Sequence, residues 1–229
     1  MEKDYVDPWS LSNEDGVFLV KIARKAVEEH LKRRVTIDPP PNTPSLFFKK
    51  GAAFVTIMTY YSYESRELRG CIGHVFPVKE LIKSVIEVSI EAAVNDPRFP
   101  PMNIDELDRV TFEVSVLGPL EPLPRNPDER INSFKIGRHG LVAKRGFMQG
   151  LLLPDVPLEY LWDNETFLAE TCLKAGMEPT CWLDEKTDFY RYSARVWREK
   201  YPLGEVEERL LEKEYEELVK NAVSKRKGV

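Results

Sequence analysis

Residues 109–117 read RVTFEVSVL, and the segment alternates between apolar and polar side chains. Val110, Phe112, Val114 and Val116 are apolar, and the residues between them are polar or charged. Because successive side chains of a strand point to opposite faces of a sheet, the segment predicts a strand with one buried and one exposed face. Such alternation is typical of antiparallel sheets, whereas strands buried in parallel sheets are apolar throughout.

The sequence on both sides of this strand predicts an intermixed series of strands and helices. Runs rich in β-branched and aromatic residues indicate strands, and apolar residues three and four apart indicate helices. Strands are expected over 52–63, 140–143, 147–153 and 187–197, and helices behind Ser12, from Pro77 to Asn95, from Asp163 to Gly176 and over 205–225. The chain is therefore predicted to be α+β, a mostly antiparallel sheet with flanking helices, in two unequal lobes of one compact unit.

One domain is predicted over residues 1–200, and its two lobes are expected to meet near the proline-rich connector at 118–127. Residues 201–229 are predicted to form a C-terminal amphipathic helical extension.

Composition excludes several classes of protein. The net charge of −5 argues against specific recognition of nucleic acid. The sequence contains no apolar run near the roughly 20 residues that cross a bilayer, and its first residues lack the features of a secretory signal. A cytoplasmic protein that does not bind membranes is expected. The charged fraction of 31% is compatible with a thermophilic source.

Three cysteines are too few, and odd in number, for the disulfide framework of a secreted protein. Cys172 is expected to lie in the core, because it falls on the apolar face of its helix. The environment of Cys181 is left open.

Cys71 lies in the segment LRGCIG at residues 68–73, which is expected to be a turn between a strand and the helix at Pro77. Glycines on both sides would let a ligand approach the backbone closely. A helix N-terminus and Arg69 nearby would stabilise a thiolate, and the turn amides could bind an anion. The alternative is a small buried cysteine in a tight turn.

Four further residues could take part in chemistry. His139, in a glycine-framed segment, could act as a base or ligand, or could only bind a turn carbonyl. Asp96 and Arg98 frame prolines in a rigid loop, where they could brace each other or present an ion pair to a cleft. His74 is spaced from Cys71 like a metal ligand, but two ligands do not make a metal site. No P-loop, dinucleotide fingerprint, nucleophile elbow or zincin motif is present, and neither a metal nor a cofactor is predicted.

The segment LRGCIG resembles the signature of the AMMECR-type family. The resemblance continues, in order, through the segments DPRFPP at 96–101, EVSVL at 113–117, HGL at 139–141, GLLLP at 150–154 and CLKAG at 172–176, and it covers roughly residues 15–196. It implies an α+β fold of two unequal lobes, but no reaction, because the biochemical activity of the family is not established. The family usually has threonine where this chain has His74. Family members are fused to, or encoded beside, a Memo-type dioxygenase-like protein and a radical enzyme, which implies such partners.

Two hypotheses about function follow. The first is a module that binds a small molecule, a peptide or a protein partner in a cleft at Leu68–Gly73. The alternative is an enzyme in which Cys71 is the nucleophile or redox thiol, His139 is its base and Arg69 stabilises the anion. The enzyme hypothesis requires Cys71 and His139 to converge on one cleft. The predicted ligand-binding residues are Arg69, Gly70, Cys71, Ile72, Gly73, Asp96 and Arg98.

Overall fold

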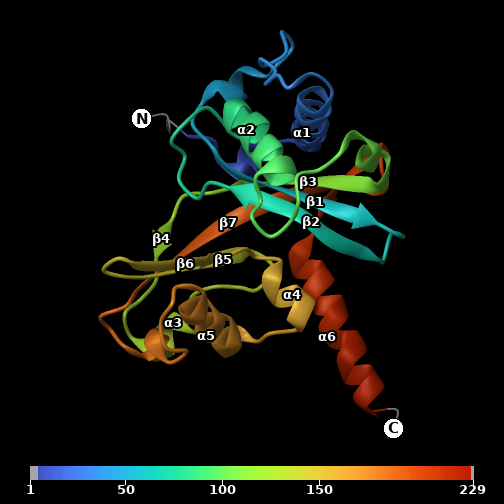
Figure 1. The fold of residues 1–229 in the computed structure, drawn as a ribbon. Helices are drawn as coiled ribbons and strands as arrows, with labels where there is room; N and C mark the ends of the chain where they lie inside the picture. Colours follow the sequence, from blue (N-terminus) through green and yellow to red (C-terminus); the bar gives the residue numbers. More distant parts are fainter. Residues whose placement is uncertain (1–4, 228–229) are drawn as a thin grey trace. The chain divides into compact units, whose positions relative to one another are not determined.

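The computed structural model describes the backbone of residues 5–227 and the side chains up to residue 224 (Figure 1). It confirms the predicted fold class, because its helices flank antiparallel sheet. The chain divides into two compact units. Unit 1 comprises residues up to Gly118 together with Arg195–Arg209, and unit 2 comprises Pro119–Ala194 together with the residues from Leu210 onward.

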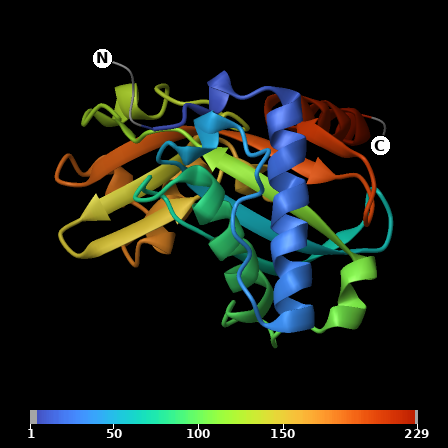
Figure 2. The same ribbon diagram turned by 90° about the horizontal axis from the view of Figure 1, so that it is seen from above.

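Unit 1 contains a sheet with the strand order β2-β1-β3-β7, and β8 pairs with β7. The register sets apolar residues opposite each other, such as Val55 opposite Val114 and Ile57 opposite Phe112. The helices α1 and α2 run side by side across one face of this sheet (Figures 1 and 2). The elements of unit 1 are η1 (Pro8–Ser10), α1 (Asn13–Arg33), η2 (Ser45–Phe48), β1 (Ala52–Tyr60), β2 (Arg66–Gly73), α2 (Leu81–Val94), η3 (Ile104–Arg109), β3 (Val110–Leu117) and β8 (Val206–Arg209). Strand β7 (Asp188–Glu199) contributes residues to both units.

Helix α1 begins where the sequence predicts. Ser12 accepts a hydrogen bond from the Asp15 N–H at 3.1 Å, and the Asp15 carboxylate accepts one from the Ser12 N–H at 2.8 Å. This reciprocal capping satisfies two amide donors that the first helical turn leaves without partners. The helix ends at Arg34, whose backbone is left-handed with φ 59°.

A buried ion pair joins α1 to β7 within the core of unit 1. Arg24 donates from Nε and Nη2 to the two carboxylate oxygens of Glu199, at 2.6 and 2.5 Å. Glu199 also accepts the Phe112 N–H at 2.9 Å, and Arg24 donates to the carbonyls of Leu107 and Val110. Because both charges are out of water, their mutual hydrogen bonds are what make their burial tolerable.

Unit 2 contains the strands β6 (Met148–Leu152), β5 (His139–Arg145) and β7 in that order, and β4 (Glu121–Pro122) also pairs with β7. All of these pairs are antiparallel, and β5 and β6 form the predicted hairpin. Its helices are α3 (Pro127–Arg130), α4 (Val156–Tyr160), α5 (Asn164–Lys174), η4 (Cys181–Leu183) and α6 (Leu211–Lys227).

Two predicted helix boundaries are wrong. Helix α2 begins at Leu81 rather than near Pro77, because backbone hydrogen bonds to residues 49 and 51 hold the chain extended up to that point. The predicted helix over 205–225 begins only at Leu211. Residues 206–209 form β8 instead, whose Glu207 and Glu208 pair with arginines of β7.

The predicted exposed face of β3 is also wrong, because both faces of this strand are buried. The polar residues Thr111, Glu113 and Ser115 are all less than 10% exposed. Glu113 can be buried because Arg209 of β8 donates to its carboxylate at 3.1 Å. A charged residue in a strand therefore indicates exposure only if no partner of opposite charge lies beside it.

The two cysteines of unit 2 form a disulfide that was not predicted. Cys172 and Cys181 are bonded, with 5.9 Å between their Cα atoms, and both side chains are buried as the core prediction for Cys172 required. The cysteine count therefore does not argue for a reducing compartment.

Candidate functional site

The segment LRGCIG is part of the edge strand β2, not a turn. Cys71 lies opposite Thr56 of β1, and Gly70 lies opposite Ile57. Met58 then lies opposite Leu68, so Arg69 is an extra residue in β2, which is the definition of a β-bulge. Since α2 begins only at Leu81, Cys71 does not lie at a helix N-terminus.

The glycines beside Cys71 are required by packing. A Cβ atom at Gly70 would lie 2.0 Å from the carbonyl oxygen of Ala92 in α2. A Cβ atom at Gly73 would lie 2.5 Å from the carbonyl oxygen of Ala53 and 2.6 Å from the Cα atom of Phe54. Glycine therefore allows close approach here, as expected. The group that approaches is the protein's own backbone rather than a ligand.

Arg69 is bound to Glu106. Its Nε and Nη2 donate to the two carboxylate oxygens at 2.7 and 3.1 Å, and Nη2 also donates to the carbonyl of Pro100. The guanidinium holds the pKa of Glu106 below its usual value. Nη1 of Arg69 is buried and has no hydrogen-bond partner among the described residues. The bulge thus turns Arg69 toward η3, where its charge is largely compensated.

Asp96 and Arg98 bind each other and also bind the outer edge of β2. Asp96 is 4% exposed and accepts the Cys71 N–H at 2.8 Å. Arg98 donates to both carboxylate oxygens of Asp96, at 2.9 and 2.7 Å, and to the Cys71 carbonyl at 3.2 Å. These bonds satisfy the backbone N–H and carbonyl of Cys71 on the edge strand β2, which would otherwise be open to pairing with another strand.

The ion pair also sets the charge of Asp96. Hydrogen bonds from the Arg98 side chain and, to a lesser extent, from the Cys71 and Arg98 amides lower the pKa of Asp96 to about 2. The carboxylate therefore remains charged at any pH near neutrality, which favours the bracing role over a role in proton transfer.

The thiol of Cys71 is partly buried and lies outside the disulfide. Its sulfur accepts a hydrogen bond from the hydroxyl of Thr56 at 3.2 Å. Thr56 is in turn directly opposite Glu113 of β3. Directly opposite residues of neighbouring strands share a face, so thiol, hydroxyl and carboxylate form one row across the sheet.

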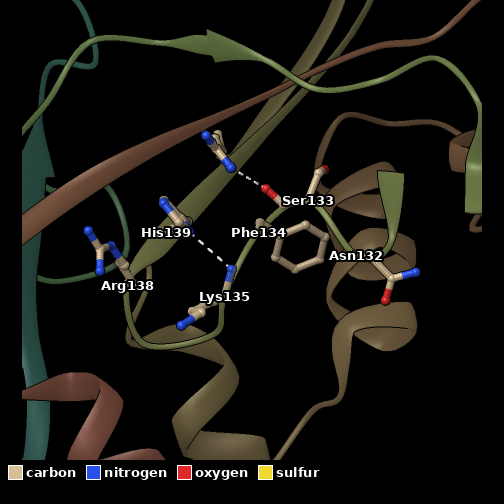
Figure 3. A pocket seen from close by; sticks show the side chains of 7 residues that line it. Asn132, Ser133, Phe134, Lys135, Arg138 and His139 are labelled. Carbon is tan, nitrogen blue, oxygen red and sulfur yellow. Dashed lines mark hydrogen bonds between the residues drawn. The ribbon is translucent and has the colours of Figure 1, made fainter. Parts of the chain in front are cut away.

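His139 lines a hollow of about 280 Å³ in unit 2, shown in Figure 3. Its Nδ1 accepts the Lys135 N–H at 3.0 Å. Burial, and then the charges of Arg191 and Arg138, lower the pKa of His139 to about 4. The ring is therefore neutral at pH 7, and with Nδ1 engaged as an acceptor its proton lies on Nε2. His139 is arranged to donate a hydrogen bond rather than to accept a proton.

The proposed dyad of Cys71 and His139 stays a prediction, since the two residues belong to different compact units. A cleft at Leu68–Gly73 also stays a prediction. Two hollows of the described chain lie in unit 2, and neither includes these residues.

Neither a metal cluster nor a membrane-spanning helix is found in the part of the chain that the structure describes. Over residues 5–227, no three His, Cys, Asp or Glu side chains gather as a metal would require, so Cys71 and His74 gain no third ligand. Within the same range, no helix is long and apolar enough to cross a membrane.

Sequence reasoning missed the partners of the motif residues. Glu106 lies in η3, whose capping box with Asn103 is present, and no local pattern marks it as the partner of Arg69. Thr56 carried a usable indication, because it is a polar residue between apolar residues of β1, and Glu113 carried one because it is the charged residue of β3. For Lys135 and Arg191 no such indication existed, since isolated basic residues are common on surfaces.

The edge strand β2 carries the segment LRGCIG, and the loop that begins at Asp96 binds its outer edge. Together with the α+β fold, these two motifs define a class of protein that is recognised by its motifs rather than by a known reaction. The chain belongs to the AMMECR1 family, whose model matches residues 20–197.

Close relatives come from thermophiles. A protein of Thermococcus gammatolerans is 48% identical over 86% of this chain and 97% of its own length. A protein of Aeropyrum pernix is 44% identical over 91% of this chain and 89% of its own length. The crystal structure of the uncharacterised protein PH0010 from Pyrococcus horikoshii matches with a TM-score of 0.82 and 46% identity, and covers 86% of this chain and 97% of that one.

Proposed function

We propose that this protein is a binding module that docks a protein partner on the surface around the Leu68–Gly73 motif. The observation that carries the proposal is the density of exposed apolar side chains there. Of 21 exposed large apolar side chains among the described residues, five fall between residues 61 and 78: Tyr61, Tyr63, Leu68, Phe76 and Val78. Scattered exposed apolar residues need no explanation, whereas a contiguous apolar patch is typical of interaction surfaces, and we infer that side chains along and beside the edge strand β2 form such a patch.

The polar groups of the motif favour binding over catalysis. Arg69 is bound to Glu106, and the amide of Cys71 donates to Asp96. An oxyanion pocket needs donors that are directed at an incoming ligand, but these donors are directed at the protein's own carboxylates. Leu68, which is 37% exposed, and the partly buried thiol are what the motif offers to a partner.

The alternative function is an enzyme with a Cys71 nucleophile or redox thiol, assisted by His139 and Arg69. It is supported by the partial exposure of the thiol and by the hydrogen bond from Thr56. It requires a base, and His139 already uses its Nδ1 to accept the Lys135 N–H. The binding hypothesis therefore explains more of the observed contacts.

Titration calorimetry with a purified partner tests the proposal. The partners to try are the Memo-type protein and the radical enzyme implied by the family resemblance. Leu68→Asp places a charge in the centre of the proposed surface and should weaken binding at least about tenfold, as expected for a contact near the centre of an interface. Leu173→Asp is the matched control, because Leu173 is similarly exposed but lies on α5 of unit 2.

Cys71→Ser separates the two functions. A binding surface should tolerate this change with less than about a threefold effect on Kd, since it replaces one atom at a partly buried position. Equal loss of binding in Leu68→Asp and Leu173→Asp would show that the surface is elsewhere. A chemical activity that disappears in Cys71→Ser would favour the enzyme.

A further inference from the structure

The hollow beside His139 is lined by basic side chains. Lys135, Arg138, His139 and Arg191 are among the residues that line it, and Figure 3 shows the first three along the segment 135–139. The remaining lining residues are Asn132, Ser133 and Phe134, so none of the side chains that line the hollow is acidic.

The pairing of β5 with β7 brings two of these side chains together. His139 lies opposite Ser193, and Leu141 lies opposite Arg191. Residues two apart on a strand share a face, so His139 and Arg191 are diagonal neighbours on one side of the sheet. Side chains at such diagonal positions lie within reach of each other and of one ligand.

The turn that carries Lys135 and Arg138 is held in place by α6. Gly137 has a φ of 78°, which glycine adopts without strain. A Cβ atom at this position would lie 2.7 Å from backbone atoms of Leu211 and Glu212. The backbone of the turn therefore has little freedom, which fixes the points from which the Lys135 and Arg138 side chains extend.

The charges around the hollow are only partly compensated. Arg191 pairs with Glu121 at 2.9 Å and donates to the Ser133 carbonyl. Arg138 pairs with Glu212 at 3.8 Å, where both side chains are well exposed to solvent. Lys135 forms no ion pair with any residue between 5 and 224.

We propose that this hollow binds a small organic anion, with a carboxylate or phosphate group held by Lys135, Arg138 and the Nε2–H of His139. Charged nitrogen donors in a partly enclosed site are the chemistry that recognises such groups. The volume lies near the lower end of the range for small-molecule sites, so the ligand carries a short carbon skeleton. Phe134 offers that skeleton an apolar wall. Its side chain is buried and packs edge-on against Phe167, with 5.9 Å between the ring centroids.

The full chain can be titrated with inorganic phosphate and, separately, with succinate, while its amide and imidazole nitrogen resonances are followed by NMR. Saturable shifts at Ser133–His139 and at the His139 ring are expected, with a Kd near or below about 1 mM for at least one probe. The probe that saturates at the lower concentration identifies the preferred head group.

Lys135→Gln should raise this Kd about two- to fivefold, the range expected for a charged contact at an exposed site. Lys144→Gln is the control, because Lys144 is an exposed lysine of β5 outside the hollow and its loss changes the net charge equally. Both side chains are exposed, so neither change threatens folding.

Shifts that do not saturate would overturn the proposal, and so would an equal effect of both substitutions, since that would show general attraction of anions to a basic surface. The result is independent of the docking surface proposed above, whose test uses a substitution in unit 1.

Discussion

Replacing Gly70 by alanine tests whether the glycines of the motif serve packing. The added Cβ would lie 2.0 Å from the carbonyl oxygen of Ala92 and 3.0 Å from its carbon, and real Cβ contacts are essentially never below 3.0 Å. Both atoms belong to the backbone of α2, so no rotation of a side chain can relieve the contact. Either β2 or the last turn of α2 must move by about 1 Å, in a core that is packed as densely as a crystal.

The expected loss of unfolding free energy follows from this geometry. Overpacking of a dense core costs about 1–3 kcal/mol. Replacing glycine in a strand returns about 0.5–1 kcal/mol by restricting the unfolded chain. Because the obstacle is backbone, the upper part of the first range applies, and a net loss of about 2 kcal/mol is expected. For a chain of this size that corresponds to a melting temperature lower by roughly 4–8 °C.

Guanidinium unfolding followed by circular dichroism measures the loss, and hydrogen exchange locates it. Faster exchange is expected in β2 and at the end of α2. The control is Gly146→Ala, where φ is 59° and nothing lies within 4 Å of the added atom. This substitution should cost only the backbone strain of about 1–2 kcal/mol and should affect the β5–β6 hairpin alone. A Gly70→Ala protein within about 0.5 kcal/mol of the parent would refute the packing argument and restore ligand approach as the reason for glycine.

Three further outcomes are expected. Asp96→Asn should lower the unfolding free energy by about 2 kcal/mol at pH 7, because the pKa of Asp96 is about 2 in the folded protein, below the ordinary 3.8. In acid-unfolding curves the parent should lose this contribution as the pH falls from about 4 to 2, and the variant should show no such loss. Glu199→Gln should cost about 3–5 kcal/mol in guanidinium unfolding, because it leaves the buried charge of Arg24 without its carboxylate. Reduction of the Cys172–Cys181 bond, which closes a short loop, should lower the unfolding free energy of unit 2 by about 2–3 kcal/mol, and an unchanged unfolding curve would contradict this.

The strands could be predicted because their signal is local. Alternation located β3 and β7 to within a few residues, and a run of β-branched and aromatic residues located β1, but β2 was wrongly expected to be a turn. What covers a strand is decided by residues far away in sequence. Glu113 was predicted to be exposed because it alternates with apolar residues, but its partner Arg209, which makes its burial possible, lies 96 residues away. A side chain's burial therefore depends on contacts that a local pattern does not contain.

The boundaries of α2 and α6 failed for a related physical reason. Pro77 is a favourable first residue of a helix, but backbone bonds to residues 49 and 51 keep the chain extended up to Leu81. Residues 206–209 have an acceptable helical composition, yet strand pairing with β7 and two ion pairs outweigh it. Helix propensity is a weak preference that tertiary contacts readily override.

At the candidate site, too, the local pattern indicated which residues to consider but not their distant partners. The sequence singled out the residues of LRGCIG and DPRFPP as a candidate site, which stays a prediction, and it could not show which residues of the protein they bind. Asp96 meets the Cys71 amide 25 residues away, and Arg69 meets Glu106 37 residues away. The cysteine pair was missed because spacing alone does not show that two side chains approach within bonding distance.

The two proposed sites differ in how far the protein itself engages their hydrogen-bonding groups. In the motif of unit 1, the carboxylates of Asp96 and Glu106 engage the arginines and the Cys71 amide, so the groups left for a partner are mainly apolar. In the hollow of unit 2, Lys135 has no ion pair among the described residues, and the neutral ring of His139 has a donor at Nε2 once Nδ1 is engaged.

Apolar surface favours a protein partner, because burying it releases water without requiring new polar contacts. Uncompensated donors favour an anion, because a carboxylate or phosphate satisfies several of them at once. If both proposals hold and the two sites act independently, phosphate at saturation should leave the Kd of a Leu68-dependent partner unchanged, and a changed Kd would show that the two sites are coupled.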